Sequence, residues 1–477
     1  MKTQRIKLLS LLFLLSFINV GCFEDLDDNP PSTKDLNNFV WKGLNAYYLY
    51  KEEVPNLANN RFNDSEYDSF LSSFSSPEDL FESLLFQRQS IDRFSWITDN
   101  YIELQQQLNG NTFNNGMEFG LVRFSNTSTE VFGYVRYVLP NTDAESKGLK
   151  RGDIFHAVNG VSLNMNNYRQ LLSPNNYTIN LAVYNDNGTP ETDDDTIEST
   201  NQSINLTKSP YTENPVFIKQ VLEVANQNVG YLMYNGFTRD FDSHLNDTFG
   251  YFQSQNIQNL VLDLRYNSGG SVNTAILLSS MITGQFTGQV FCTEQWNSEI
   301  QSQLAPNSLI NNFTNTNNGT QLNSLNLSKV YILTSKSTAS ASELVINCLN
   351  PYIDVIQIGT TTTGKYQASI TLFDSADFSG QNINPIHTYA MQPLVMKTIN
   401  AVGNTDYNEG LNPDFPVKEN YGDLGVLGNP EETLLAAALQ HIIYGGRMSI
   451  EPISNLEVIG DSKDFTLTKN RMYIDKK

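Results

Sequence analysis

The fold of this chain is decided by residues 329–369, which read KVYILTSKSTASASELVINCLNPYIDVIQIGTTTTGKYQAS. The apolar and β-branched run at 330–334 predicts a buried strand, and the apolar residues of 344–349 predict a helix that ends before an Asn-Pro pair. A second short strand is predicted at 355–358. This stretch therefore predicts a strand, a tight turn, a helix and a second strand.

A small hydroxyl residue, Ser340, stands where the first strand turns into the helix. The first amide N–H groups and the positive dipole end of a helix can stabilise negative charge that develops beside them. A serine needs a base to act as a nucleophile, and Lys365 is the nearby candidate because burial can lower a lysine pKa by roughly 3–5 units. The pattern has a structural alternative: Ser340 followed by Glu343 is also a capping box, which starts a helix without any chemistry.

The string TASASE at 338–343, with Gly364-Lys365 downstream, resembles two segments of the C-terminal processing (tail-specific) peptidase family. These segments carry the Ser-Lys dyad of that family. The resemblance implies that Ser340 is the nucleophile, that Lys365 is the general base, and that the Ala341 N–H is one oxyanion donor.

The chain departs from the family pattern at one position. Members of the family often carry a glutamine four residues after the lysine, which orients it. In this sequence that position is Ser369, and the glutamine is Gln367. Whether Gln367 or Ser369 orients Lys365 is left open.

A further part of the resemblance lies at residues 263–270, DLRYNSGG. Paired glycines let the backbone turn sharply and bring amide N–H groups close to a ligand. The string resembles the Asp-Leu-Arg-x-Asn-x-Gly-Gly segment that supplies a second oxyanion donor in the same peptidases. The resemblance implies that Gly269 or Gly270 has this role, with Gly270 favoured. Without the Ser-Lys segments, a plain strand-to-helix turn would explain the pattern equally well.

Residues 140–160, PNTDAESKGLKRGDIFHAVNG, resemble part of a PDZ domain. They predict a short helix that ends at a glycine, a turn with Gly-Asp, and a strand that ends in Asn-Gly. PDZ domains bind extended peptides, often free C-termini, by adding a strand to a sheet edge. The candidate carboxylate loop lies between Gly116 and Leu121, so Gly120 and Leu121 are the predicted peptide-binding residues. The alternative is a module that only braces the peptidase domain.

The N-terminus has the layout of a bacterial lipoprotein signal peptide. Three basic residues precede the apolar run at 8–15, which is too short to span a membrane. The pair Gly21-Cys22 resembles a lipobox, so Cys22 is the predicted lipidated first residue of the mature protein; plain cleavage beside an incidental cysteine is the alternative. We therefore predict a protein of the bacterial cell envelope, lipid-anchored to the outer membrane on its periplasmic or surface face.

The composition narrows the possible partners. The chain has 477 residues, 39% of them hydrophobic, which suits a folded protein of about three domains. Its net charge of −21 makes nucleic acid and anionic lipid headgroups poor partners. The four histidines are scattered and no metal-binding spacing is present, so no metal or cofactor is predicted. Cys348 falls on the apolar face of the helix after Ser340 and is predicted to be a buried free thiol.

The periodicity of the apolar residues is helical at first, then typical of short strands, and finally alternates between strands and helices. This order, with the family resemblance, predicts a multidomain α+β protein with a crotonase-like α/β catalytic domain, a PDZ-like β domain and a small N-terminal helical domain. The predicted boundaries are 1–21 for the signal peptide, 22–36 for an acidic tether, 37–110 for the helical domain, 111–212 for the PDZ-like domain, 213–447 for the Ser-Lys peptidase domain and 448–477 for a C-terminal tail or added strand. Residues 92–95, DRFS, resemble a segment near the end of the helical part of the same peptidases.

The resemblance implies a serine endopeptidase that cleaves protein or peptide substrates through an acyl-enzyme on Ser340. It implies recognition of C-terminal or extended segments by the PDZ-like domain. A rival hypothesis is a non-catalytic, peptide-binding surface lipoprotein with a degenerate peptidase domain, and the displaced Gln367 is the feature that supports it. A glycan-binding surface lipoprotein is a third hypothesis; the aromatic content of 11% suggests it, but no sugar-site motif does.

Overall fold

The computed structural model describes residues 31–124, 128–189, 194–445, 456–469 and 472–474. The predicted signal peptide, Cys22 and most of the acidic tether lie outside the described residues. Among the described helices, none combines the length and the apolar character that crossing a membrane requires.

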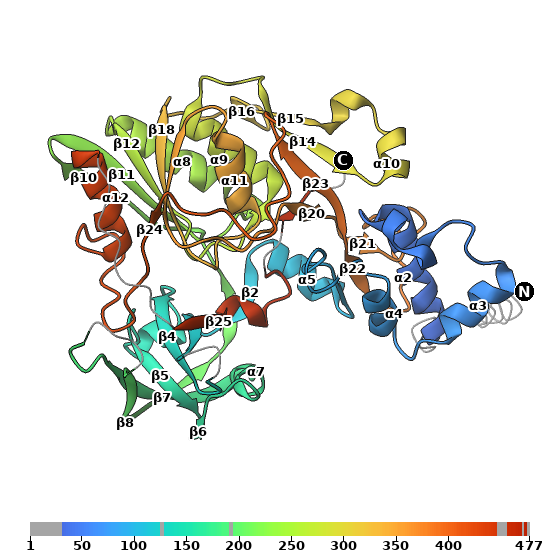
Figure 1. The fold of residues 1–477 in the computed structure, drawn as a ribbon, viewed down its shortest axis with the longest axis horizontal. Coiled ribbons are helices and arrows are strands. Elements are labelled where there is room, and N and C mark those ends of the chain that lie inside the picture. Colours follow the sequence, from blue (N-terminus) through green and yellow to red (C-terminus); the bar gives the residue numbers. More distant parts are fainter. Residues whose placement is uncertain (1–30, 125–127, 190–193, 446–455, 470–471, 475–477) are drawn as a thin grey trace, which may run out of the picture.

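A six-stranded sheet forms the centre of the molecule, in the spatial order β10-β11-β12-β18-β19-β24 (Figure 1). The strands are β10 (Val216–Val224), β11 (Gln227–Tyr234), β12 (Asn259–Asp263), β18 (Lys329–Thr334), β19 (Asp354–Gly359) and β24 (Phe415–Pro416). Only β10 and β11 are antiparallel; the other neighbours run parallel. Alternating strands and helices, as seen in the sequence, are typical of such a mostly parallel sheet.

Helices cover both faces of this sheet, because successive side chains of a strand point to opposite faces. Leu262 and Ile332 pack into the core on one side, whereas their neighbours Val261 and Tyr331 pack into a second core on the other. The first face is covered by α8 (Asp242–Ser254), α9 (Val272–Thr283) and α11 (Ala341–Leu349), and the second by α12 (Thr433–Tyr444). Each fully buried Leu or Ile in these cores contributes about 1.5–3 kcal/mol.

A second six-stranded sheet brings together segments that lie far apart in the sequence. Its order is β13-β26-β20-β23-β14-β15. The strands are β13 (Gly270–Ser271), β26 (Met472–Tyr473), β20 (Gln367–Ser369), β23 (Leu394–Asn400), β14 (Val290–Trp296) and β15 (Ile310–Asn312). Cys292 of β14 and Cys348 of α11 are buried free thiols, which confirms the prediction for Cys348.

The N-terminal region is helical, as predicted, but its core is continuous with that of the α/β part. Phe39 and Leu80 belong to the same apolar cluster as Leu262. The helices are α2 (Thr33–Tyr47), α3 (Asp64–Ser72), α4 (Pro77–Ser83) and α5 (Tyr101–Leu108). A strand between them, β1 (Trp96–Thr98), pairs with β22 (Ala390–Gln392), so the helical region is attached to the α/β part by backbone hydrogen bonds.

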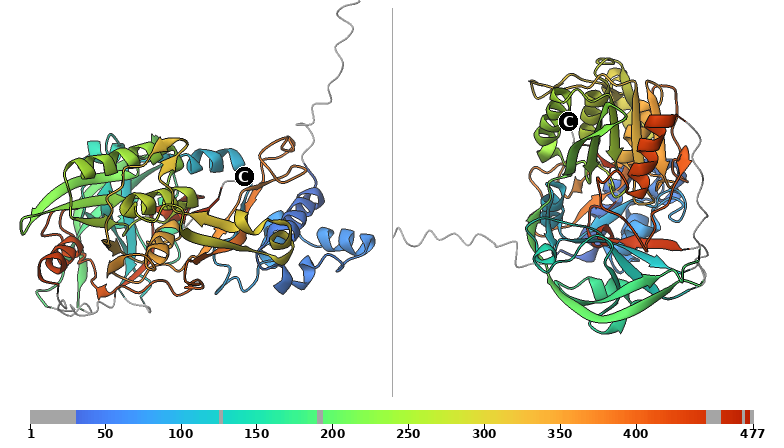
Figure 2. Two further views of the ribbon diagram at one scale, coloured as in Figure 1. Left: turned by 90° about the horizontal axis from the view of Figure 1, so that it is seen from above. Right: turned by 90° about the vertical axis from the view of Figure 1, so that its left-hand side faces the viewer.

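Residues 117–207 form a separate β unit with its own core, below the central sheet in Figure 1 and as a distinct group of strands in Figure 2. Its strands are β3 (Met117–Arg123), β4 (Val131–Val138), β5 (Ile154–Val158), β7 (Asn176–Asn185) and β8 (Thr196–Thr207), with the short helices α6 (Asp143–Ser146) and α7 (Tyr168–Leu172). The chain enters and leaves this unit through β2 (Asn111–Asn114) and β9 (Ser209–Thr212), which pair antiparallel.

The C-terminal residues form an added strand at two places rather than a free tail. β25 (Glu457–Asp461) pairs antiparallel with β3 at the edge of the β unit. After the short 3-10 helix η6 (Ser462–Phe465), β26 lies between β13 and β20 of the second sheet. Of the two alternatives for the C-terminal residues, the described part therefore shows the added strand, at β25 and at β26.

Candidate active site

Ser340 occupies a strained turn between β18 and α11. Its backbone angles are φ 67° and ψ −116°, a combination that costs a non-glycine residue about 1–3 kcal/mol. The side chain is buried, and its Oγ has no hydrogen-bond partner among the described residues. Ala341 begins the helix, so its N–H has no intrahelical acceptor. The Ser340 side chain therefore makes no capping hydrogen bond, and its hydroxyl lies unused beside the first amide of the helix.

The Glu343 carboxylate connects two loops. One is the turn at 335–340 that carries Ser340, called here the nucleophile turn, and the other is the loop that carries Lys365. It accepts hydrogen bonds from the N–H groups of Ser340 (2.7 Å), Gly364 (2.6 Å) and Lys365 (2.8 Å), and from the Thr362 hydroxyl. Burial raises the pKa of this carboxyl, and the hydrogen bonds oppose the rise. The predicted capping box is thus half present: Glu343 caps the Ser340 amide, but the Ser340 hydroxyl stays unbonded.

The Lys365 side chain is buried, and only 2% of the residue is exposed. Burial lowers the pKa of its amine from 10.5 to about 7, while the charges of Asp92 and Glu343 oppose this shift. Its Nζ lies 5.3 Å from the centroid of the Phe94 ring. A substantial fraction of Lys365 is therefore unprotonated at neutral pH, and the unprotonated amine is the form that a general base requires.

The loop before the lysine is fixed from the N-terminal region by Arg93. The guanidinium Nη2 donates to the backbone oxygens of Thr363 (3.1 Å), Gly364 (2.8 Å) and Asn408 (2.9 Å). Gly364 has φ +90°, and a Cβ there would lie 2.1 Å from the Asn408 oxygen, so only glycine fits. No local sequence pattern predicts a role for Arg93; the resemblance of the DRFS string is the only signal that marks this residue.

The same string supplies a buried carboxylate near the lysine. Asp92 is fully buried and accepts from the Tyr48 hydroxyl (2.7 Å) and from the N–H (2.9 Å) and hydroxyl (2.6 Å) of Ser95. Its charge is the larger of the two that raise the pKa of Lys365 against the effect of burial. The N-terminal region therefore belongs to the site, which the sequence alone did not indicate.

The turn at 265–270, called here the glycine-rich turn, is hydrogen-bonded to the nucleophile turn on both sides of Ser340. The backbone oxygen of Asn267 accepts from the Ala339 N–H (3.1 Å) and from the Ser342 hydroxyl (3.0 Å). These two residues flank the Ser340-Ala341 pair. The turn that was predicted to supply an oxyanion donor is therefore held against the nucleophile.

Within this turn, the contacts favour Gly270 over Gly269 as an oxyanion donor. The Gly269 N–H donates to the Asn267 side-chain oxygen at 2.9 Å and is already engaged. Gly270 has φ +144°, and a Cβ there would lie 2.3 Å from the Phe237 backbone oxygen. Only glycine can occupy this position without displacing the Phe237 backbone.

Comparison with known proteins identifies the family. The model of "Peptidase family S41" matches residues 228–415, which contain Gly270, Ser340 and Lys365, and the model of "Peptidase S41 N-terminal domain" matches 35–96. The chain belongs to peptidase family S41. This confirms the predicted kinship with the C-terminal processing peptidases. The N-terminal match also covers Asp92 and Arg93, the two residues that the sequence had left without a role.

Two curated relatives of this S41 family member are processing enzymes by name. A carboxyl-terminal-processing protease of Picosynechococcus sp. is 24% identical over 249 residues, covering 51% of this chain and 53% of the relative. The chloroplastic carboxyl-terminal-processing peptidase 2 of Arabidopsis thaliana is 22% identical over 287 residues, covering 59% and 49%. The matches thus span about half the length of these relatives.

The fold is shared with a solved structure. The crystal structure of a Bacteroides fragilis NCTC 9343 protein assigned to the S41 proteases has a TM-score of 0.65 and 25% identity. It covers 85% of this chain and 97% of that one. The mixed α/β, multidomain architecture described above is therefore an S41 peptidase fold.

The two candidates for orienting the lysine are held differently in this S41 peptidase fold. The Gln367 Nε2 donates to the Tyr50 hydroxyl at 3.0 Å, and its Oε1 has no hydrogen-bond partner within the described ranges. Ser369 pairs through its backbone with Leu394 and Tyr473 in β20. Gln367 is thus held by the N-terminal region, and its carbonyl oxygen is unused.

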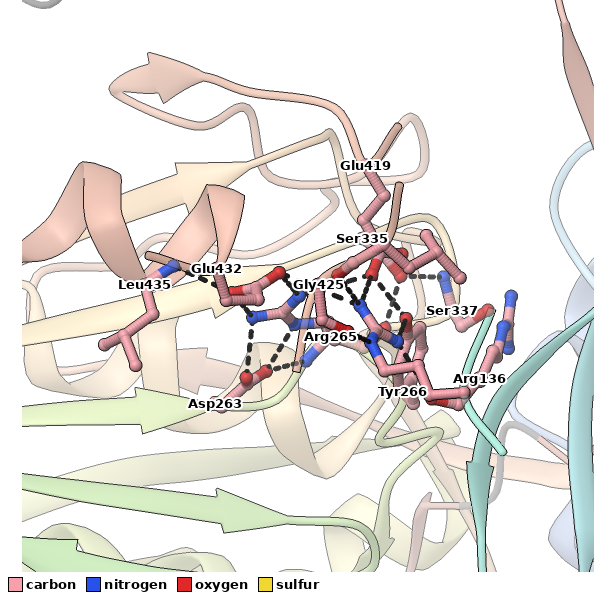
Figure 3. A network of polar contacts seen from close by, with 12 residues as sticks. Arg136, Asp263, Arg265, Tyr266, Ser335, Ser337, Glu419, Gly425, Glu432 and Leu435 are labelled. Carbon is pink, nitrogen blue, oxygen red and sulfur yellow. Dashed lines mark hydrogen bonds and ion pairs between the residues drawn. The ribbon is translucent and has the colours of Figure 1, made fainter. Parts of the chain in front are cut away.

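A buried ionic network surrounds Arg265, the arginine of the DLRYNSGG string (Figure 3). Arg265 pairs with Asp263 (2.8 Å), Glu432 (2.6 Å) and Glu419 (3.2 Å). Arg151, from the β unit, also pairs with Glu419, at 2.7 Å. Each of these buried charges has a partner, and the shared Glu419 connects the β unit to the glycine-rich turn.

The predicted peptide-binding residues lie on β3, at a sheet edge. Gly120 pairs with Asp461 of β25 and Leu121 pairs with Gly460. This edge is therefore covered by the C-terminal strand of the same chain. Throughout the described residues, no group of three or more His, Cys, Asp or Glu side chains is placed to hold a metal ion.

We expect Glu343→Ala to reduce the free energy of unfolding by about 3–5 kcal/mol, because it leaves three buried N–H groups without an acceptor. Urea unfolding followed by circular dichroism measures this loss. Glu343→Gln, which keeps one acceptor oxygen and the volume, is the matched control and should lose less. A Glu343→Ala protein as stable as the parent would show that the carboxylate does not hold the two loops together.

Proposed function

We propose that this S41 family member is a serine endopeptidase that hydrolyses peptide bonds of protein substrates through a Ser-Lys acyl-enzyme mechanism. One observation carries the proposal. The strained Ser340, with an unbonded Oγ, is tied through Glu343 to the loop of Lys365, whose amine has a pKa of about 7. This arrangement supplies a nucleophile and a base that is unprotonated in part at neutral pH.

In the proposed reaction, the Lys365 amine takes the Ser340 Oγ proton while the oxygen attacks the carbonyl carbon of the scissile bond. The negative charge of the tetrahedral intermediate falls on the former carbonyl oxygen, where the N–H groups of Ala341 and Gly270 would stabilise it. The Lys365 ammonium then gives its proton to the departing amine. Water, deprotonated by Lys365, hydrolyses the acyl-enzyme and restores Ser340.

We further propose that the substrates are C-terminal or extended segments of proteins that bind at Gly120 and Leu121. The names of the two curated relatives support such substrates, and the position of these residues on a sheet edge supports strand addition. The β unit would then act as a PDZ domain, and the central α/β layer as a crotonase-like domain. The lipobox supports anchoring through Cys22 in the bacterial outer membrane.

The non-catalytic alternative is less consistent with the site. It drew its support from the displaced glutamine, but Gln367 is nevertheless buried in the strand that follows Lys365. A degenerate site would have no need to keep a buried lysine amine on a loop that Glu343 ties to the turn of a strained serine. The peptidase therefore remains the better hypothesis.

A serine-reactive phosphonate tests the proposal directly. The mature chain is incubated with the reagent and its intact mass is measured, with Ser340→Ala and Ser342→Ala in parallel. We expect one adduct on the parent and on Ser342→Ala, and none on Ser340→Ala. An adduct that persists in Ser340→Ala would place the nucleophile elsewhere. No adduct on any protein, with or without an added peptide substrate, would favour the non-catalytic alternative.

A further inference from the structure

The C-terminal segment of the chain occupies the edge at which peptides are expected to bind. β25 lies antiparallel on β3, with Glu457 opposite Arg123 and Asp461 opposite Gly120. Addition of an antiparallel strand is the way in which PDZ domains bind peptides. Ile459 and Phe465 pack against the core of the β unit, where the Phe465 ring lies 6.0 Å from that of Phe119. The segment thus makes the contacts of a bound peptide.

The segment then continues toward the glycine-rich turn. The Phe119 N–H donates to the Ser462 hydroxyl at 3.3 Å. The Lys463 ammonium donates to the backbone oxygens of Asn235 (2.8 Å) and Tyr266 (3.0 Å). Ser462 and Lys463 also line a cavity of about 130 Å³ whose wall includes Ser268 and Gly269 of the glycine-rich turn. The path from the β3 edge therefore leads to the glycine-rich turn.

The end of the segment lies between the two halves of the site. Met472 pairs with Gly270, the favoured oxyanion donor, and Tyr473 pairs with both Ser271 and Ser369. Both residues of β26 are buried. A strand that pairs with Gly270 occupies the position next to the oxyanion donor, which the backbone of an extended substrate would need. Ser340 and Lys365 are themselves buried in this structure.

Asp461 joins the segment to the nucleophile turn and to β4. Its carboxylate contacts the Arg136 guanidinium of β4 at 2.9 Å and the Ser337 hydroxyl at 2.8 Å. Ser337 precedes Ser340 in the same turn. Burial would raise the pKa of Asp461, but Arg136 and Ser337 hold it well below its usual value. The segment therefore brings an ionised carboxylate to a fixed place between the β unit and the nucleophile turn.

We propose that the described C-terminal segment, residues 456–469 together with β26, is an intramolecular ligand of the peptide-binding path, which a substrate must displace before cleavage. The contacts of β25 and β26 are the evidence for this ligand. Its effect on cleavage rests on the proposed peptidase function. A tethered ligand has an effective concentration in the millimolar range. The apparent affinity for a free peptide is therefore the intrinsic affinity multiplied by the fraction of molecules in which the segment is displaced.

The seated segment also indicates what kind of peptide fits. The chain passes Glu118 and continues, with the Ser462 hydroxyl donating to the Glu118 carboxylate. A free C-terminal carboxylate at this point would be repelled by Glu118. At this point the edge therefore favours an extended segment that continues past Glu118, with an apolar residue at the place of Ile459 and an acidic residue at the place of Asp461, where it can pair with Arg136.

Peptide binding tests the inference independently of catalysis. A fluorescent synthetic peptide with the sequence of residues 456–466 is titrated into the full chain carrying Ser340→Ala, with and without Ile459→Asp. We expect the Ile459→Asp protein to bind it at least tenfold more tightly. Replacing the acid that corresponds to Asp461 by alanine in the peptide should remove most of this gain. Val402→Asp, the same change of chemistry at a residue that is 71% exposed, is the matched control and should bind like the parent.

If Ile459→Asp does not fold, a reversible disulfide that holds β25 on β3, called here the lock, tests the same inference. Arg123 and Glu457 are opposite each other in register, and such neighbours have Cα atoms about 4.5–5.5 Å apart, which suits a disulfide. The double variant Arg123→Cys/Glu457→Cys should cleave a peptide substrate at least tenfold more slowly when oxidised, and reduction should restore the rate. The pair Asn185→Cys/Thr196→Cys, which locks β7 to β8, is the matched control and should show no such change.

The outcomes separate the two hypotheses. Equal peptide binding by the parent and Ile459→Asp proteins, or equal cleavage by the oxidised and reduced lock, would overturn the intramolecular ligand. If neither form of the lock cleaves any peptide, the peptidase proposal fails. In that case the same lock, titrated with the fluorescent peptide, still decides the inference: the oxidised form should bind at least tenfold more weakly than the reduced one.

Discussion

Ser340→Ala is expected to lower kcat/KM for peptide cleavage by about 10⁴–10⁶-fold, because removing a covalent nucleophile leaves only the oxyanion donors and substrate binding. The structure adds a second expectation that concerns stability. Ser340 has φ 67° and ψ −116°, a conformation that glycine adopts without the cost of a Cβ. Ser340→Gly should therefore be as inactive as Ser340→Ala but more stable by about 1–3 kcal/mol.

Steady-state cleavage of a peptide and urea unfolding of the same samples measure both effects. Ser342→Ala is the matched control, because Ser342 lies in the same turn and donates to the Asn267 backbone oxygen. It should keep most of the activity and lose about 1–3 kcal/mol of stability. If Ser340→Gly were less stable than Ser340→Ala, the strain at this turn would not be stored in the backbone of residue 340.

The part of the site that is local in sequence could be predicted from it. The strand before Ser340 was placed at 330–334 and is β18 (Lys329–Thr334), and the helix after it is α11. Apolar periodicity determines such elements because one face of each must be buried. The role of Glu343 was only half visible: the capping pattern predicted its bond to Ser340, but not its bonds to the amides of Gly364 and Lys365.

The parts that depend on contacts between distant segments could not be predicted. Arg93 reaches the backbone oxygens of Thr363 and Gly364, some 270 residues away, and no local pattern encodes such contacts. The same holds for β25 and β26. Each is short and irregular in its apolar pattern, and each is a strand only because another strand presents its edge. Pairing of this kind is determined by the assembled fold.

The chemistry of Lys365 depends on both kinds of contact. The lysine is recognisable in the sequence beside Gly364, but its pKa is set by the surrounding structure. Burial lowers it, and the charge of Asp92, which the N-terminal region contributes, limits how far it falls. The N-terminal helices are thus expected to tune the base as well as to support the fold.

We expect Lys365→Met to lower kcat/KM by about 10⁴–10⁶-fold, because no proton acceptor then remains for the Ser340 hydroxyl. In the parent protein the amine has a pKa of about 7, and only its unprotonated form acts as a base. Therefore kcat/KM should rise with pH through about 7 and level off above it. Asp92→Asn removes a charge that raises this pKa, so the rise should move to lower pH.

The same lysine predicts how stability depends on pH. Its pKa is about 7 in the folded chain and near 10.5 when unfolded, so between these values the unfolded chain binds more protons. Stability should then increase with pH across this window, and Lys365→Met should abolish that increase. Below pH 7 the variant should be more stable than the parent by about 3–5 kcal/mol, since it no longer buries a charge.

A pH–activity profile and urea unfolding at pH 6 and pH 9 test the expectations for activity and for stability. An active Lys365→Met protein would refute the dyad, whereas an inactive variant with no change in the pH dependence of stability would mean that the lysine is charged in the resting site.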